Sequence, residues 1–326
     1  MEWLRDHNSS LKSPNKVGVF GMDIYALHES IDEVLEYLQK VGDDQGAQFV
    51  RSKYSRLLEY RNKMDDYRRT VEEGLQNCSA DVTEVVNFLD EVGWDYLKGL
   101  EPIEEQTALL DAKQNALVVK HAEQYYRVGS FGGVFSWNVR DNAMCELLQS
   151  VLVHHQVVGV DKPKCVIWAH NSHLGDARAT EWAERDEQNV GQLLRENFGL
   201  ESTFSILFST FSGSVTASMK WGVDHQIFEL NESVLGSDSE LFHRANHQLE
   251  EREEGVQDFA LVFRSNDATF TVDDDLCRAL IPARRQRAVG VVYSKENEMS
   301  AHYFSASIPL QADVMIHIEN TKHLQL

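Results

Sequence analysis

The sequence predicts an α/β protein with a mainly parallel sheet flanked by helices, and three observations lead to this fold class. Short, nearly uninterrupted apolar runs recur along the chain, as in strands that are covered on both faces. Apolar residues at helical spacing separate these runs, as in βαβ units. Finally, 42% of the 326 residues are hydrophobic, which is enough for a large core.

The first predicted unit is a strand followed by a helix. The apolar run at 17–20 (VGVF) reads as a buried strand that ends in a turn at Gly21-Met22-Asp23. Ser30 and Glu33 form a capping box at the start of the next helix. The apolar side chains of this helix recur at the spacing of one face: Ile31, Val34, Leu35 and Leu38.

A largely helical insertion is expected at about 48–156. Asp81 with Glu84 indicates one helix start, and the segment 103–127 contains neither Pro nor Gly while apolar residues recur along it. The glycine-bearing stretch 129–133 predicts a loop. A helix at 137–156 follows it, with Ser136 or Asn138 as its N-cap.

The second half of the chain returns to strands. The stretch 223–257 is acidic and polar and predicts a surface excursion. With no internal repeat and no clean linker, we expect a single domain over 1–326. The strand predictions fall at 164–169, 204–209, 258–263, 287–293 and 313–318.

The charge of the chain restricts its partners. The net charge of −21 and the pI near 5.0 oppose binding to nucleic acid or to an anionic membrane surface, and favour a neutral or cationic small molecule. The four cysteines form no C-x-x-C pair, which indicates reduced thiols. The N-terminus lacks the apolar core of a signal peptide, so a cytoplasmic protein is expected. Nothing in the sequence indicates an oligomeric state.

Polar side chains follow two of the predicted strands. Asp23 follows the run at 17–20, and the sequence HNSHLGD, from His170 to Asp176, follows the run at 164–169. Ligands of open α/β sheets lie beyond the carboxyl ends of the strands. If the two strands are parallel neighbours, Asp23, His170 and His173 converge on one crevice. Imidazoles are suited to proton transfer near neutral pH, and Asn171 and Asp176 are candidates to support them.

Other interpretations of the two histidines stay open. A histidine at a strand end is often structural, and an H-x-x-H pair can hold a metal ion. No Cys or Glu lies at ligand spacing from His170 and His173, so we expect no metal and no cofactor. The serine nucleophile elbow, the Walker loop, the dinucleotide-binding glycine motif and the H-E-x-x-H helix are all absent from the sequence.

Two further groups are candidates for supporting roles. On the helix at 103–127, His121 shares a face with Tyr125, while Glu123 and Arg127 have the spacing of an ion pair. A solvated helix face explains these residues equally well.

Arg140 and Asp141 lie near the predicted helix start after the glycine-bearing loop. Arg140 could orient a catalytic carboxylate or an anionic intermediate there. It could also simply pair with Asp141 or Glu146.

With these residues in place, the chain resembles the erythromycin esterase family, which includes succinoglycan-biosynthesis-type homologues. The resemblance covers most of residues 17–321. The blocks WAHNSH and SWNVRD together are its most specific part. The stretches that carry it are FGMDIYALHESIDEVLEYL, NALVVKHAEQYYR, SWNVRDNAMCELL, CVIWAHNSHLGDARAT, NVGQLLRENFG, RQRAVGVVY, AHYF and ADVMIHIENT.

The resemblance implies a hydrolase that opens an ester or lactone, without a required metal, by histidine-assisted attack of water. His170 and His173 match the histidines of the family's HN-x-H block. Asp23 matches its Gly-x-Asp, and Arg140 with Asp141 matches its Arg-Asp helix start.

One departure from the family pattern leads to a second hypothesis. The family's Gly-Glu-x-x-His-Gly block, which supplies the base histidine, and its second glutamate have no counterpart in this sequence. We therefore expect a domain that is incomplete at its N-terminus. The alternative function is a catalytically inactive remnant that acts as a binding or scaffold protein. A third hypothesis is a metal-dependent hydrolase that uses His170 and His173.

Overall fold

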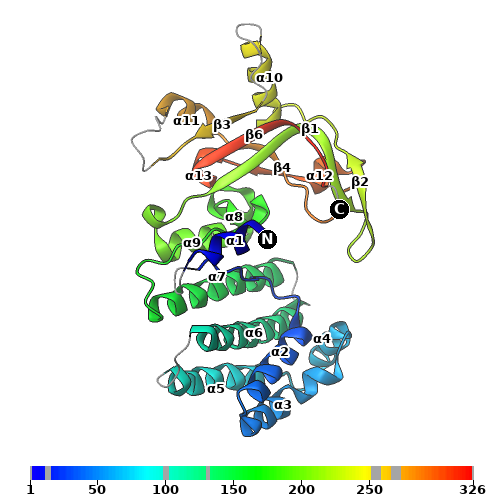
Figure 1. Ribbon diagram of the computed structural model, residues 1–326. Helices are drawn as coiled ribbons and strands as arrows, with labels where there is room; N and C mark the ends of the chain where they lie inside the picture. The colour runs from blue at the N-terminus through cyan, green and yellow to red at the C-terminus, as the bar shows by residue number, and fades with distance from the viewer. Residues whose placement is uncertain are drawn as a thin grey trace. The chain divides into compact units, whose positions relative to one another are not determined.

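The computed structural model describes residues 2–11, 16–97, 103–129, 133–250, 258–265 and 273–324. The chain forms two compact units, Met1–Ile167 and Trp168–Leu326 (Figure 1). The family-like stretches of the sequence are therefore divided between the two units, with the HN-x-H block in the second.

The first unit is helical. Its main core lies between α2, α3, α5 and α6, and the four apolar side chains predicted to share one face of α2 are all buried there. The largely helical character predicted for about 48–156 is confirmed. The helices are α1 (Glu2–Ser9), α2 (Leu27–Lys40), α3 (Asp44–Glu59), α4 (Met64–Glu72), α5 (Ser79–Leu97), α6 (Ile103–Val128) and α7 (Gly133–Val157).

Two predicted helix starts are wrong. Helix α2 begins at Leu27 with Ala26 at its N-cap, so Ser30 lies inside the helix. Burial of Leu27 stabilises the additional helical residues before Ser30. Helix α7 begins at Gly133, where the Ser136 hydroxyl donates to the Gly133 carbonyl instead of capping the helix. Arg140 therefore lies beyond the first turn, away from the helix end that would favour an anion.

The second unit contains two small sheets with short helices around them. Its elements are α8 (Asn171–Leu174), η2 (Ala177–Ala179), η3 (Glu181–Arg185), α9 (Val190–Phe198), η4 (Leu200–Ser202), β1 (Ile206–Ser218), β2 (His225–Glu229), α10 (Asp238–Glu250), β3 (Phe259–Val262), α11 (Asp274–Leu280), β4 (Arg284–Arg287), α12 (Glu298–Ala301), β5 (Tyr303–Ala306), α13 (Ile308–Gln311) and β6 (Val314–Thr321).

The expected mainly parallel sheet is not confirmed. The larger sheet has the order β2-β1-β6-β3, in which β1 and β6 are parallel while β2 and β3 pair antiparallel to their neighbours. Strands β4 and β5 form a separate antiparallel pair. The described fold is therefore mixed in helix and sheet, with one parallel pairing at the centre of its larger sheet.

Two apolar runs that predicted strands form none in the described part of the chain. The runs at 17–20 and 164–169 carry no strand assignment, and Val19, Val166 and Trp168 are 64%, 95% and 93% exposed. Apolar sequence alone does not make a strand, because the backbone must also find a hydrogen-bonding partner. The predicted strand at 287–293 is likewise reduced to the end of β4 and an isolated bridge at Val292.

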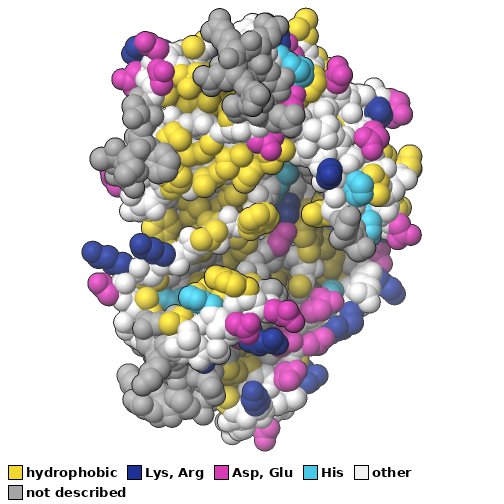
Figure 2. Space-filling model, turned by 45° about the horizontal axis from the view of Figure 1, so that its top comes forward, with side chains coloured by type: hydrophobic (Ala, Val, Ile, Leu, Met, Phe, Trp, Pro, Cys, Tyr) yellow, Lys and Arg dark blue, Asp and Glu magenta, His cyan; other side chains and the backbone are white. Residues whose placement is uncertain are grey.

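The side chains on the two faces of β1 differ in how far they are buried. Leu207 and Phe211 are buried, on the side where α10 packs, whereas Ile206 and Phe208 are 42% and 48% exposed. Figure 2 shows hydrophobic side chains gathered on one face of the molecule. The expectation that the sheet is covered on both faces is therefore wrong for this stretch. The predicted surface excursion also contributes to the core, since Phe242 of α10 is 3% exposed.

No helix among the described residues combines the length and apolar character needed to cross a bilayer. The cysteines are all free thiols. Cys78 and Cys145 are buried, Cys277 is half-buried and Cys165 is exposed.

Candidate functional site

The HN-x-H block forms a short, tightly bonded turn in the second unit. His170 is the N-cap residue of α8, and its Nδ1 accepts a hydrogen bond from the Ser172 amide at 3.2 Å. The Ser172 hydroxyl oxygen lies 2.8 Å from the same nitrogen. Because an amide can only donate, Nδ1 carries the lone pair of the neutral ring. Nε2 then carries the proton, and the ring also hydrogen-bonds to the Val289 backbone.

His170 is held in its neutral form. Burial lowers the pKa of the His170 imidazole, and the nearby His173 side chain lowers it further. His173 is itself buried, at 8% exposed. A neutral imidazole with its lone pair on a known nitrogen can accept a proton, which is the first requirement for a general base.

Asn171 links this turn to the sheet. Its side-chain Nδ2 donates to the Phe208 carbonyl at 2.6 Å, and its Oδ1 accepts from the Phe208 amide at 3.3 Å. The side chain thus pairs with β1 as a strand backbone would. Asn171, predicted from the sequence as a supporting residue, thus positions the histidine turn against β1.

A second asparagine, Asn189, fixes the turn from the other side. It is fully buried as the N-cap of α9, and its Nδ2 donates to the carbonyls of Ser172 and Gly175 at 2.9 and 2.5 Å. Gly191 allows this close approach, because a Cβ atom there would lie 2.1 Å from the Leu174 carbonyl oxygen. The residues after the histidines therefore pack directly on the start of α9.

Asp176 belongs to a buried ion-pair network. Its carboxylate accepts from Arg178 at 2.7 Å and from Arg195 at 3.3 Å. Arg195 also reaches Asp313, which pairs with Arg264 in turn. Burial acts to raise the pKa of Asp176, but the hydrogen bonds from Arg178 and the charge of Arg195 lower it. Asp176 thus ties η2 to α9 through Arg195, and Arg195 in turn links α9 to Asp313, directly before β6.

Asp23 and Arg140 meet in the first unit. The Arg140 Nε and Nη2 atoms donate to the two carboxylate oxygens of Asp23 at 2.9 and 2.7 Å. The guanidinium also lies over the Tyr25 ring, 5.0 Å from its centroid. This planar, two-bond geometry orients a carboxylate well. Arg140 thus pairs with Asp23, a partner not weighed from the sequence, and the charge of the neighbouring Asp141 also acts on it.

The helix α6 carries two buried polar groups rather than a solvated face. His121 Nε2 lies 2.9 Å from Glu146, whose pKa this hydrogen bond lowers to about 2. Glu123 is 1% exposed, and it accepts from Tyr67 and from Arg127. The predicted ion pair of Glu123 and Arg127 is confirmed. Asp141 is fully buried.

The predicted site residues thus form separate groups. Asp23, Arg140, Asp141, His121 and Glu123 belong to the first unit, and His170, Asn171, His173 and Asp176 belong to the second. The expected convergence of Asp23 with the histidines stays a prediction.

Sequence reasoning missed two residues of the second group, Ser172 and Asn189. The position of Ser172 between the two histidines indicates that it could contact them. Asn189 could have been found as the N-cap residue of the apolar helix that begins in the stretch NVGQLL.

A group of metal-ligating side chains lies elsewhere in the second unit. Among the described residues, one group of three ligand side chains lies close enough to share an ion, and it consists of His243, His247 and Glu319. His170 and His173 do not belong to it. A metal-dependent reaction at the HN-x-H turn therefore has no third ligand in the described part of the chain.

A family model described as erythromycin esterase matches residues 1–321. The chain belongs to the erythromycin esterase family. The match runs through both compact units and includes every candidate site residue named above.

Solved structures agree with this family in fold. The chain is similar to a succinoglycan biosynthesis protein, with a TM-score of 0.70 and 17% identity over 98% of this chain and 69% of that one. It is also similar to a protein from Bacillus cereus, with a TM-score of 0.73 and 18% identity, over 98% and 70% of the two chains. A mutant of the erythromycin esterase EreC in its open conformation has a TM-score of 0.58 and 11% identity, over 98% and 72%.

Proposed function

We propose that the protein is a hydrolase of the erythromycin esterase type, which cleaves a carboxylic ester or lactone by histidine-assisted attack of water. The observation that carries the proposal is the family match over residues 1–321. The neutral, half-buried His170 supports it, because its local contacts leave a lone pair on Nδ1. The substrate class follows from the family and from EreC, a member whose name describes it as an erythromycin esterase.

The contacts of His170 suggest a path for the proton. In this path the Ser172 hydroxyl donates to His170 Nδ1, 2.8 Å away, and its oxygen would accept from the attacking water molecule. As the water oxygen attacks the carbonyl carbon, its proton passes to Ser172 Oγ, and the Ser172 proton passes to Nδ1. The tetrahedral intermediate then expels the alkoxide, which takes the proton back from the imidazolium. The products are a carboxylic acid and an alcohol, and His170 returns to its neutral form.

Asp23 and Arg140 are proposed as supporting residues of the same activity. Their pair fixes a carboxylate and a guanidinium in one geometry, with Tyr25 against the guanidinium. An Arg140→Lys variant keeps the charge but cannot form the planar two-bond contact. We expect it to lower kcat/KM on the best ester while the fold is retained.

One observation favours a second candidate, a binding protein without turnover. The bonds of His170 go to Ser172, two residues later, and to the distant Val289 backbone, and they hold the ring as a structural cap would. In this candidate the turn shapes a ligand site but transfers no proton. The two functions differ in whether product forms.

The test is hydrolysis by the purified chain of p-nitrophenyl acetate, p-nitrophenyl butyrate and erythromycin, with products identified by mass. We expect His170→Ala and Ser172→Ala to lower kcat by about 100- to 10,000-fold, the usual share of general-base catalysis. His225→Ala, at an exposed histidine of β2, is the matched control and should retain full activity.

Two results would count against the hydrolase. Equal turnover by His170→Ala and the unmodified chain would remove His170 from the reaction. Binding of these compounds, detected by calorimetry, without any product would favour the second candidate instead.

A further inference from the structure

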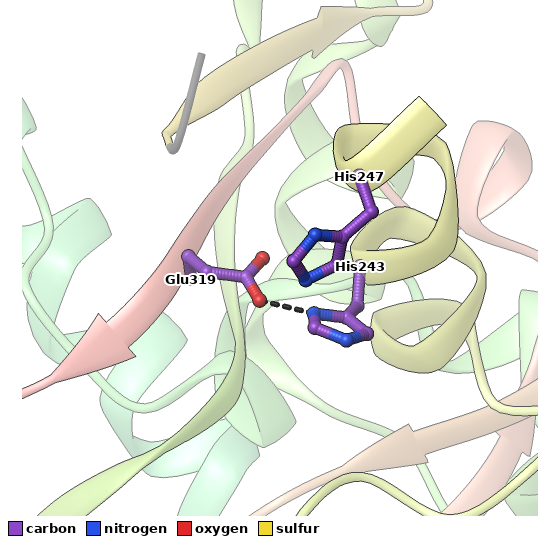
Figure 3. Close-up of side chains that lie close together, drawn as sticks. All are labelled: His243, His247 and Glu319. Carbon is purple, nitrogen blue, oxygen red and sulfur yellow. Dashed lines mark hydrogen bonds and ion pairs between the residues drawn. The ribbon is translucent and has the colours of Figure 1, made fainter. Parts of the chain in front are cut away.

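Three metal-ligating side chains meet on the sheet of the second unit, outside the candidate site described above. His243 and His247 lie one helical turn apart on α10, and Glu319 lies on β6. Their ligand atoms all lie within 4.8 Å of one another. Figure 3 shows both imidazoles projecting from the helix toward the carboxylate.

The fold brings these residues together through the register of the central strands. Ser209 of β1 is paired with His317 of β6, so Phe211 and Glu319, two residues further along each strand, face the same side. Helix α10 packs on that side through Phe242, whose ring contacts those of Phe259 and His317. The strand register and the packing of α10 on the sheet thus place the three candidate ligands close together.

The first ligand is already oriented. The His243 ring stacks on Phe211 with a centroid distance of 3.6 Å and an interplanar angle of 3°. Its Nδ1 contacts Glu319 Oε1 directly. The ring can therefore turn little, and its nitrogen stays beside the carboxylate.

The carboxylate is also held by two neighbours on the oxygen that His243 does not contact. His317 Nε2 and Asn246 Nδ2 lie 3.2 and 3.3 Å from Glu319 Oε2, and both approach that oxygen alone. The second nitrogen of His317 lies 2.9 Å from the Ser209 hydroxyl. These contacts hold the Glu319 carboxylate beside the two imidazoles of α10.

We propose that His243, His247 and Glu319 bind one divalent transition-metal ion, with zinc as the ion that fits their donor set best. Two imidazoles and one carboxylate are a common ligand set for zinc, and imidazole nitrogens disfavour magnesium and calcium. Ligand atoms around a tetrahedral zinc ion lie about 3.4 Å apart, given bonds of about 2.1 Å. The exposed His247 side chain can close the remaining distance by a change of rotamer.

The bound ion would join α10 to β6. It replaces the single contact between His243 and Glu319 by three bonds to one centre, with a fourth position open to water. His317 and Asn246 act as positioning residues, since they orient the carboxylate without contacting the ion. A resident ion would therefore raise the melting temperature of the chain, because it binds only the folded state.

The test is titration of the untagged, chelator-treated chain with ZnCl2 and CoCl2, followed by calorimetry and by the visible absorption of bound cobalt. We expect one ion per chain and a higher melting temperature in zinc. His247→Ala and Glu319→Gln should each weaken binding by more than about 100-fold, and Asn246→Ala by about 10-fold, as for the loss of a second-layer contact. His247→Ala changes an exposed side chain, so its fold should be retained.

The control variants keep the proposal open to disproof. His225→Ala should bind the ion as the unmodified chain does, and so should the double variant His170→Ala/His173→Ala. No stoichiometric ion in the unmodified chain overturns the proposal. Unchanged affinity of the His247→Ala variant for the ion also overturns it. The same holds if only the double variant His170→Ala/His173→Ala loses the ion. In these cases the contact between His243 and Glu319 is only an ion pair that fastens α10 to the sheet.

Discussion

The side chain of Asn189 donates hydrogen bonds to the carbonyls of Ser172 and Gly175, at 2.9 and 2.5 Å, and thereby holds the histidine turn on the start of α9. Its Oδ1 accepts from the amides of Ala177 and Gln192 as well. A fully buried side chain with four backbone contacts is difficult to replace.

The first prediction concerns this asparagine. Asn189→Ala leaves several buried backbone groups without partners, and each costs about 1–3 kcal/mol. We expect the free energy of unfolding to fall by about 3 kcal/mol, measured in urea. Asn115→Ala is the matched control, since the Asn115 side chain donates to the Asp111 carbonyl one turn earlier in α6. Similar losses in the two variants would contradict the role given to Asn189.

The second prediction concerns Tyr67. Its hydroxyl donates to the buried Glu123 carboxylate at 2.6 Å and accepts from the Cys78 amide at 2.9 Å. Tyr67→Phe removes both contacts at once and should lower the free energy of unfolding by about 2–3 kcal/mol. In Tyr60→Phe, which loses one longer contact of 3.3 Å to Thr70, the loss should be below about 1 kcal/mol. Equal stability of the two variants would show that the Glu123 network contributes little.

The third prediction concerns pH and Asp238. Burial raises the pKa of this carboxyl from its ordinary value of 3.8 to about 7. Its folded pKa thus lies above the unfolded one, so the stability it contributes is complete below about pH 4 and is lost as the pH rises toward 7. Asp238→Asn should remove this dependence and raise the free energy of unfolding at pH 8 by about 1–2 kcal/mol. Urea titrations at pH 5 and 8 measure it. A variant less stable than the parent at pH 8 would refute this account.

The fourth prediction follows from the proposed hydrolase. A general base works in its neutral form, and the pKa of His170 is lowered by burial and by His173. The acid limb of kcat/KM should therefore lie below pH 6.5. His173→Gln removes the neighbouring imidazole that lowers the pKa of His170 electrostatically, so it should raise that pKa and move this limb to higher pH. The measurement is the pH profile of the residual activity, and a limb that stays in place or moves to lower pH would separate His170 from the titration.

The sequence predicted the local features of the helices better than their contacts. Spacing alone identified the buried face of α2 and the pair of Glu123 and Arg127, because both depend on neighbours one turn apart. It did not predict that Asp23 pairs with Arg140, although each was selected on its own. Those two residues are 117 positions apart, and their contact depends on helix packing that no local pattern encodes.

The sheet was harder to predict for a related reason. The apolar runs at 17–20 and 164–169 have the composition of strands, but composition does not supply the partner that a strand requires. The direction of the neighbours of β1 and β6 was also hidden, because buried parallel and antiparallel strands share the same apolar pattern. In the site, Asn171 was chosen correctly as a residue of the turn, while its contact with the Phe208 backbone could be seen only in the structure.

The contact of Asn171 with the Phe208 backbone also covers part of an open edge of β1. Strand β1 pairs with β6 from Ile206 onward but meets β2 only from Ser214, so the earlier part of its other edge would offer bare backbone groups to a foreign chain. The Asn171 side chain bonds to both the amide and the carbonyl of Phe208. It does so among exposed apolar side chains, where a foreign chain would bind most strongly. The residue that follows the first histidine thus occupies a position on this edge at which a foreign strand could otherwise pair.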